Sequence, residues 1–134
     1  MLTTENTEDT EFLNREITQA VIASAISVHR ELGPGLLELV YETCLAYELT
    51  ERGHGIELQK EIPLIYRNIK FQSGFRADLI VEGRVLIELK SIDQLLPVHH
   101  AQVITYLKLT GIRTGLLINF NVPLLKEGLK RISL

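Results

Sequence analysis

Two short apolar runs near the middle of the chain constrain its fold most strongly. The sequence is LIV at positions 79–81 and VLI at positions 85–87, so branched side chains stand at successive positions. Such runs are typical of strands that are covered on both faces. The stretch from Phe75 to Lys90, FRADLIVEGRVLIELK, therefore predicts two strands joined by a turn, with other parts of the chain packed on either side.

Three charged residues interrupt these strands: Asp78, Glu88 and Lys90. An unpaired buried carboxylate is costly, so ionised groups in such strands have a counter-charge, several hydrogen bonds or a metal ion as partner. Two carboxylates and one lysine leave one negative charge too many for simple pairing. The excess suits a divalent cation, and a purely structural ion pair between Lys90 and one carboxylate is the alternative.

Spacing decides whether the three side chains share a site. Glu88 and Lys90 are two positions apart, so they project from the same face of a strand. Asp78 joins them only if the connection around residues 82–84 has an odd length. A three-residue loop pairs position 78 with 88, whereas a two-residue loop pairs it with 87 and turns Asp78 away. The shared site therefore predicts a three-residue loop or a bulge.

Apolar residues at helical spacing predict helices on both sides of these strands. The first, at about 16–32, is stopped by Gly33-Pro34-Gly35, and the second, at about 36–52, ends at Gly53. Further strands are predicted at 56–60, 62–66, 69–72 and, as the last strand, 114–119, with a third helix at 98–110 and a short basic terminal element at 124–132. Residues 1–13 are predicted to be a mobile acidic tail, and residues 14–134 a single domain.

Composition excludes several classes of protein. The 134 residues are 46% hydrophobic and 23% charged, as in an ordinary soluble globular protein. No apolar run has the length of a membrane span and the N-terminus lacks the features of a signal peptide, so we expect a cytoplasmic protein. The single cysteine, Cys44, allows no intrachain disulfide and no cysteine-based zinc site, and we interpret it as a core residue. For His29, His99 and His100 we expect surface or capping roles.

Charge is distributed unevenly along the chain. The net charge of -3 and the pI near 5.8 argue against a generic nucleic-acid binder. However, residues 1–59 hold eleven acidic and three basic side chains, whereas residues 60–134 hold six acidic and eleven basic ones. This asymmetry is compatible with a basic surface around the strands that meets phosphates, and scattered solvated charge is the alternative.

Asp78, followed by Glu88-Leu89-Lys90 at the end of the next strand, resembles the D…(D/E)-x-K signature of the PD-(D/E)XK nuclease superfamily. The resemblance implies a restriction-endonuclease-like α/β fold with an αβββαβ core, in which helices flank a central mixed sheet. Here an extra N-terminal helix would precede that core.

A second motif resembles a branch of that superfamily. Gly35, Glu38 and Tyr41 match G-x-x-E-x-x-Y, the motif of the GxxExxY protein family, and positions three apart on a helix can face the same place. The resemblance extends over about residues 17–131 through the segments VHRELGPGLLELVYE, GFRADLIVEGRVLIELK, LLPVHHAQVITYLKL and GLLINFNVPLLKEGLKR. Gln102 and Tyr106 also resemble the Q-x-x-x-Y motif of the exonuclease-like branch, for which a polar helix face is the alternative.

The resemblance implies a nuclease that hydrolyses phosphodiester bonds in nucleic acid, with DNA expected and RNA left open. Asp78, Glu88 and the carbonyl of Leu89 would hold Mg²⁺, or Mn²⁺ as a substitute, and Lys90 would orient the attacking water or stabilise the transition state. Glu38 would approach the metal from the helix, and Gln102 and Tyr106 would steady the carboxylates or contact the phosphate.

The sequence leaves open whether the protein is an enzyme and whether it acts with a partner. A catalytically silent module that binds nucleic acid or protein is the alternative to an enzyme, although such a module has no catalytic need for Asp78, Glu88 and Lys90 together. A domain of this size leaves little room for an extended recognition surface. Sequence-specific cleavage would therefore call for a homodimer or a protein partner.

Overall fold

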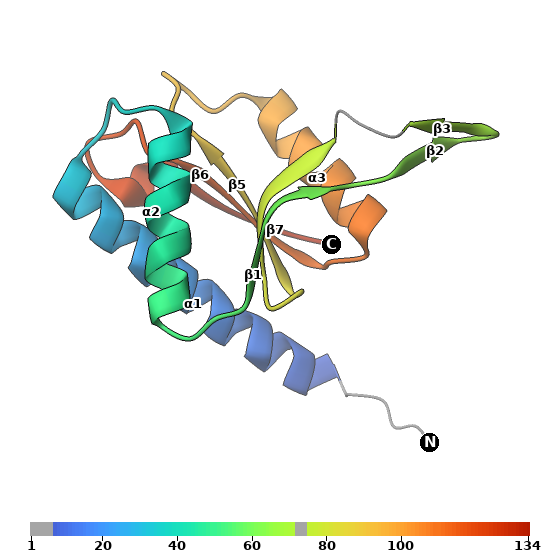
Figure 1. Ribbon diagram of the computed structural model, residues 1–134, viewed down its shortest axis with the longest axis horizontal. Helices are drawn as coiled ribbons and strands as arrows, with labels where there is room; N and C mark the ends of the chain where they lie inside the picture. Colours follow the sequence, from blue (N-terminus) through green and yellow to red (C-terminus); the bar gives the residue numbers. More distant parts are fainter. Residues whose placement is uncertain (1–6, 72–74) are drawn as a thin grey trace.

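The computed structural model of this chain describes residues 7–71 and 75–134, as three helices, seven strands and one 3₁₀ turn (Figure 1). No helix in these two ranges combines the length and the apolarity that a membrane span needs. The elements in chain order are α1 (Thr7–Leu32), α2 (Glu38–Glu51), β1 (Ile56–Glu61), β2 (Leu64–Tyr66), β3 (Ile69–Phe71), β4 (Arg76–Val81), β5 (Val85–Lys90), α3 (Pro97–Thr110), β6 (Thr114–Asn119), η1 (Leu125–Gly128) and β7 (Leu129–Ser133).

The main sheet has five strands in the order β1-β4-β5-β6-β7. Strands β5 and β6 are parallel, whereas the other three neighbouring pairs are antiparallel, so the sheet is mixed. In chain order α2, β1, β4, β5, α3 and β6 form the predicted αβββαβ core, and α1 is the extra N-terminal helix. The predicted restriction-endonuclease-like fold class is thus confirmed.

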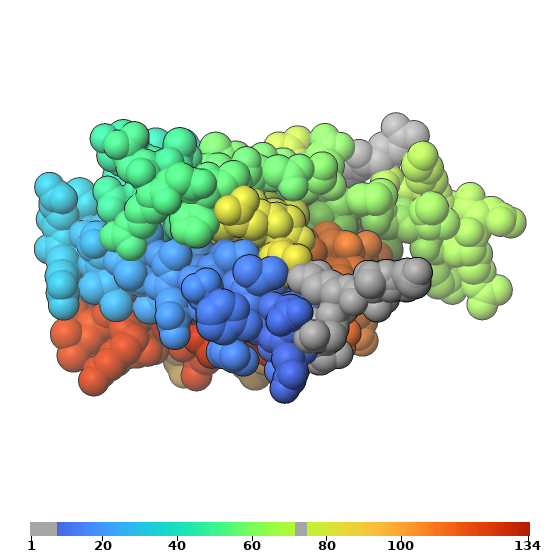
Figure 2. All heavy atoms as spheres, turned by 90° about the horizontal axis from the view of Figure 1, so that it is seen from below, coloured from blue at the N-terminus to red at the C-terminus, as the bar shows by residue number. Residues whose placement is uncertain are grey.

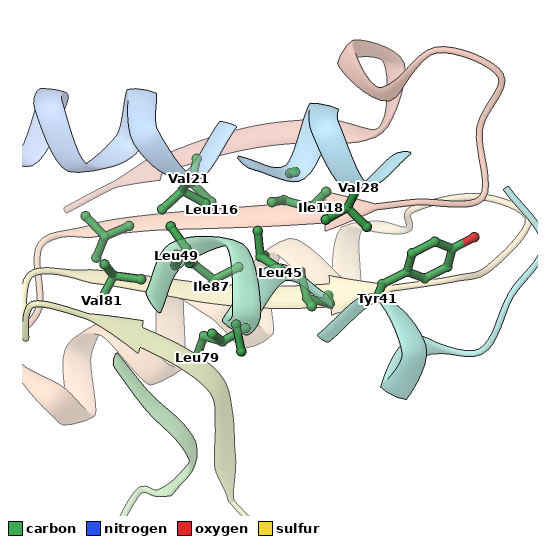
Figure 3. Close-up of a cluster of buried hydrophobic side chains, with 14 of the residues drawn as sticks. Val21, Val28, Tyr41, Leu45, Leu49, Leu79, Val81, Ile87, Leu116 and Ile118 are labelled. Atoms are coloured by element: carbon green, nitrogen blue, oxygen red, sulfur yellow. The ribbon is translucent and has the colours of Figure 1, made fainter. Parts of the chain in front are cut away.

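Helices cover both faces of this sheet, as the apolar runs predicted. On one face α1 and α2 pack Val21, Val28, Tyr41, Leu45 and Leu49 against Leu79, Val81, Ile87, Leu116 and Ile118 (Figure 3). On the other face α3 packs Val103, Tyr106 and Leu107 against Ile80, Leu86 and Leu117. Alternate residues of β5 therefore point into different cores, which places Glu88 on the α3 side together with Leu86.

One prediction about the end of the sheet is wrong. Residues 114–119 are not the last strand, because β7 follows and pairs antiparallel with β6. Strand β7 lies at the edge of the sheet and exposes Lys130 and Arg131 while burying Ile132. Charged residues are typical of edge strands. They mask the apolar pattern by which strands are predicted.

The prediction of a mobile tail over residues 1–13 is wrong for residues 7–13, which belong to α1. Glu8 and Asp9 lie in the first turn of that helix, where negative side chains interact favourably with the helix dipole. Asn14 and Ile17, one and two turns further on, are buried. Residues 1–6 lie outside the described part of the chain.

Strands β2 and β3 form a separate two-stranded ribbon that projects from one end of the molecule (Figures 1 and 2). It exposes four large apolar side chains: Ile65, Tyr66, Ile69 and Phe71. The expected strand at 69–72 ends at Phe71 in the structure, and Gln72 lies outside the described residues. The ribbon is an insertion between β1 and β4 of the αβββαβ core.

His29 takes neither the surface role nor the helix-capping role that was expected. It is buried, and its Nε2 lies 2.8 Å from the carbonyl oxygen of Val122, so it joins α1 to the segment after β6. His99 has the expected capping role, because its Nδ1 accepts a hydrogen bond of 2.9 Å from the backbone N–H of Leu96. Cys44 is partly buried and packs against the core, as predicted.

Candidate functional site

The connection between β4 and β5 has the length that the shared site requires. Val81 pairs with Val85, so three residues separate the strands, and Arg84 N–H closes the turn on the Val81 carbonyl at 2.9 Å. Glu82 and Gly83 have φ values of 55° and 64°, in the left-handed region. The register then continues through Leu79 opposite Ile87. This register brings position 78 opposite position 88, as predicted.

At that point the side chains replace the regular ladder. The backbone N–H of Asp78 donates to Glu88 Oε2 at 2.8 Å, and the backbone N–H of Leu89 donates to Asp78 Oδ2 at 2.8 Å. The regular β4–β5 pairing ends with Leu79 and Ile87, one position before this exchange. Each carboxylate is thus bound to the backbone of the other strand, which holds both in a defined place.

Glu42 and Gln59 join this pair, although the sequence analysis missed both. Gln59 Nε2 donates to Glu42 Oε1 at 2.6 Å and lies 3.3 Å from Asp78 Oδ1. Gln59 has a φ of 49°, an uncommon value for a residue other than glycine, and such backbone strain concentrates at functional sites. Glu42 lies one helical turn after Glu38, and this spacing was the available signal.

Glu38 lies at the start of α2 and reaches the end of β5. Its Oε2 accepts a hydrogen bond of 3.4 Å from the backbone N–H of Ser91, the residue after Lys90. The Ser91 hydroxyl also donates to the carbonyl of Leu36, just before α2. Glu38 is therefore placed beside the strand that carries Glu88 and Lys90.

Tyr41, which was expected to face the same place as Glu38, belongs to the core instead. It is fully buried, and its ring stacks on Phe120 with the centroids 4.4 Å apart. Its hydroxyl donates to the carbonyl of Gly33 at 2.6 Å and accepts from the N–H of Leu36 at 3.1 Å. Tyr41 therefore fixes the turn between α1 and α2, while Glu38 alone of this motif reaches the carboxylates.

Negative charge accumulates around Glu88, which is 5% exposed. Burial raises the pKa of Glu88 to about 8, and the charge of Asp78 adds to the increase, while the Asp78 N–H and Lys90 oppose it. Burial also raises the pKa of Glu42, with Asp78 and Glu38 as further contributors. Four carboxylates thus interact with one another at this place. Because Glu38 and Glu42 add to the two carboxylates of the strands, the excess of negative charge is larger than predicted from the strands alone.

Lys90 is close enough to lower the pKa of Glu88. It is half-buried, and it forms no direct ion pair with a carboxylate of residues 7–71 or 75–134. Its backbone carbonyl accepts a hydrogen bond of 2.9 Å from the N–H of Phe120, which anchors the end of β5. The ammonium group is therefore near the carboxylates without being neutralised by a contact with one of them.

Tyr106 approaches the same carboxylates from α3. It is 5% exposed, and its pKa is raised first by burial and then by the charges of Glu88 and Asp78. A side-chain hydrogen bond with the exposed Gln102 opposes this shift. The two residues of the Q-x-x-x-Y motif therefore contact each other, and Tyr106 lies within electrostatic reach of the site.

The donor set fits a hard divalent cation. Within the described ranges no three His, Cys, Asp or Glu side chains form a ready-made metal cage. Asp78 and Glu88 nevertheless each bind a backbone N–H through one oxygen; the second oxygen of Asp78 accepts only a long hydrogen bond of 3.3 Å from Gln59, and each carboxylate has lone pairs left for a cation. Mg²⁺ is usually bound by one or two carboxylates together with waters and substrate phosphates. These two carboxylates with the Leu89 carbonyl match that chemistry, and a cation would offset the repulsion that raises the pKa of Glu88.

Comparison with known proteins agrees with this geometry. A family model described as the PD-(D/E)XK nuclease superfamily matches residues 15–132. No curated protein and no solved structure matches the chain significantly. The match covers most of the chain, including all of the elements that carry the carboxylates. The chain therefore belongs to the PD-(D/E)XK nuclease superfamily.

Proposed function

We propose that this protein is a metal-dependent nuclease that hydrolyses phosphodiester bonds, with DNA as the expected substrate. One observation carries the proposal: Asp78 and Glu88 are each hydrogen-bonded to the backbone of the other's strand, beside Lys90, which forms no ion pair within residues 7–71 and 75–134. A purely structural role would be better served by direct ion pairing of Lys90. The proposal rests on this arrangement together with membership of the superfamily.

Asp78, Glu88 and the carbonyl of Leu89 would hold the cation, Mg²⁺ or Mn²⁺. When bound, such a cation supplies positive charge that polarises the scissile phosphate and lowers the pKa of water. The Leu89 N–H holds Asp78 and the Asp78 N–H holds Glu88, so both carboxylates are oriented before any ligand arrives. Because the backbone N–H groups already hold these carboxylates, they need no reorganisation during the reaction.

Lys90 would stabilise the negative charge that develops on the phosphate, because its ammonium group has no contact partner among the described carboxylates. Tyr106 and Gln102 would contact a phosphate oxygen or steady Glu88 from the α3 side. Glu38 would position the end of β5 through Ser91. Gln59 would orient Asp78 while Glu42 holds Gln59.

A cleavage assay tests the proposal. The wild type is incubated with single-stranded DNA, double-stranded DNA and RNA in Mn²⁺ or in EDTA, beside Lys90→Ala and, as a control, Lys126→Ala. Lys126 is exposed and lies in η1, away from the carboxylates in sequence. We expect metal-dependent cleavage that Lys90→Ala abolishes and Lys126→Ala retains. Metal or nucleic-acid binding without turnover would instead support the silent binding module.

A further inference from the structure

A polar hollow lies at the opposite end of the sheet from the carboxylates. In the parallel pair of β5 and β6, Val85 pairs with Thr114 and Lys90 with Asn119, so Thr114 and Lys90 mark opposite ends. The hollow has a volume of about 430 Å³, within the size range of small-molecule sites. Its wall combines the first half of α1 with the strand ends at Thr114 and Ser133.

Three arginines from separate parts of the chain line this hollow. Arg15 comes from α1, Arg113 from the segment before β6, and Arg131 from β7. Their side chains are exposed, and none forms an ion pair with an acidic group of the described ranges. Glu11 and the terminal residue Leu134 also line the hollow, so three positive charges face at most two negative ones and the wall remains positive. Three arginines around one hollow suit an oxyanion.

A buried amide in the wall supplies an independent observation. Asn14 is 9% exposed, and its Nδ2 donates to Thr114 Oγ1 at 3.2 Å, while its Oδ1 has no partner in the described part of the chain. Exchanging the two ends of the amide would let the Thr114 hydroxyl donate to Oδ1, but Nδ2 would then be left unpaired. One polar end of Asn14 therefore lacks a partner in either orientation. Buried polar groups in folded proteins are normally hydrogen-bonded, so Asn14 calls for a partner that the described residues do not supply.

Size and charge together select the ligand class. A carboxylate offers two oxygens, whereas a terminal phosphate offers three and carries up to two negative charges, which matches three arginines. A bare phosphate would leave much of a hollow of about 430 Å³ unfilled, and it would not need the buried Asn14 amide. We propose that this hollow binds a phosphate monoester of nucleotide size, with the phosphate on the arginines and the organic part hydrogen-bonded to Asn14. The site is separate from the carboxylates and stands without the proposed nuclease function.

Calorimetric titration of the full chain in EDTA tests the ligand class, because EDTA removes any metal-dependent binding at the carboxylates. The probes are adenosine 5′-monophosphate, inorganic phosphate and adenosine. We expect the nucleotide to bind more tightly than phosphate, and adenosine not to bind. An absence of nucleotide binding, or adenosine binding as tightly as the nucleotide, would overturn the proposal.

Variants locate the binding. Arg15→Gln and Arg30→Gln remove the same charge from the same helix, but only Arg15 lines the hollow. We expect Arg15→Gln and Arg113→Gln to weaken nucleotide binding about tenfold each, as for loss of a charge-assisted contact, and Arg30→Gln to have no effect. Equal weakening by Arg15→Gln and Arg30→Gln would show unspecific charge attraction and contradict the site.

A third variant separates the two parts of the ligand. Asn14→Ala should reduce nucleotide affinity towards that of phosphate while leaving phosphate affinity unchanged, since the arginines remain. Melting temperatures confirm that each variant is folded, and the arginines are exposed, so their replacement should leave the core intact. An unchanged ratio of nucleotide to phosphate affinity in folded Asn14→Ala would refute the role assigned to Asn14.

Discussion

Asp78 and Glu88 exchange hydrogen bonds with each other's strands: the Asp78 N–H donates to Glu88, and the Leu89 N–H donates to Asp78. The carboxylates therefore close the gap where the β4–β5 ladder ends, and the same groups concentrate negative charge. Under the proposed function, these two side chains serve both the fold and the metal site. Substitutions that preserve hydrogen bonding should then differ in their unfolding free energy from substitutions that remove it.

Asp78→Asn and Asp78→Ala separate those two roles. Asparagine keeps an oxygen for the Leu89 N–H and removes the repulsion with Glu88, so the metal-free protein should keep or gain stability. Alanine leaves that N–H unpaired, which should cost about 1–3 kcal/mol of unfolding free energy. Urea denaturation in EDTA measures both. Equal losses in the two variants would contradict the part that hydrogen bonding plays here.

Stability of the metal-free protein should depend on pH through Glu88. Burial raises the pKa of Glu88 from its ordinary 4.5 to about 8, so between these values the folded state binds a proton that the unfolded state has released. Stability should therefore fall as pH rises from about 5 to about 8, and level off above it. Urea denaturation at a series of pH values measures this trend. Glu88→Gln should flatten it, and the same slope in that variant would show that other groups are responsible.

Conservative replacement of Tyr41 should lower stability, whereas conservative replacement of Glu38 should lower the cleavage rate. Tyr41→Phe loses the hydroxyl that binds Gly33 and Leu36, and the loss of these part-buried hydrogen bonds should cost about 1 kcal/mol of stability. Its Mn²⁺ affinity should be unchanged. Glu38→Gln should leave the melting temperature nearly unchanged and lower the cleavage rate. A loss of metal affinity in folded Tyr41→Phe would contradict the assignment of Tyr41 to the core.

Tyr106→Phe tests the approach of α3 to the site. The ring remains in the core, so the unfolding free energy should change by no more than about 1.5 kcal/mol, the worth of a hydrogen bond. Cleavage should slow, because the hydroxyl near Glu88 is lost. Tyr47→Phe is the matched control, since Tyr47 is 63% exposed on α2. Comparable cleavage rates in both variants would contradict a role of Tyr106 in the site.

Local sequence patterns predicted the two central strands, but they missed the long-range contacts of the site and the edge strand β7. Branched apolar runs and the period of a strand were enough to place Glu88, because both depend on neighbours in sequence, whereas the assumption of a shared site predicted a three-residue loop or a bulge. Gln59 and Glu42 escaped notice because their meeting with Asp78 depends on how α2 and β1 pack against β4. Strand β7 escaped because an edge strand with charged residues has no clear apolar period.

The most direct test of the central claim is a titration of the metal-free protein with Mn²⁺ by calorimetry. Asp78→Asn and Glu88→Gln are compared with Glu57→Gln, a half-exposed surface carboxylate that pairs with Lys60. We expect the wild type and Glu57→Gln to bind Mn²⁺, and neither Asp78→Asn nor Glu88→Gln to bind it. Absence of binding by the wild type, or undiminished binding by both site variants, would contradict a metal centre at Asp78 and Glu88.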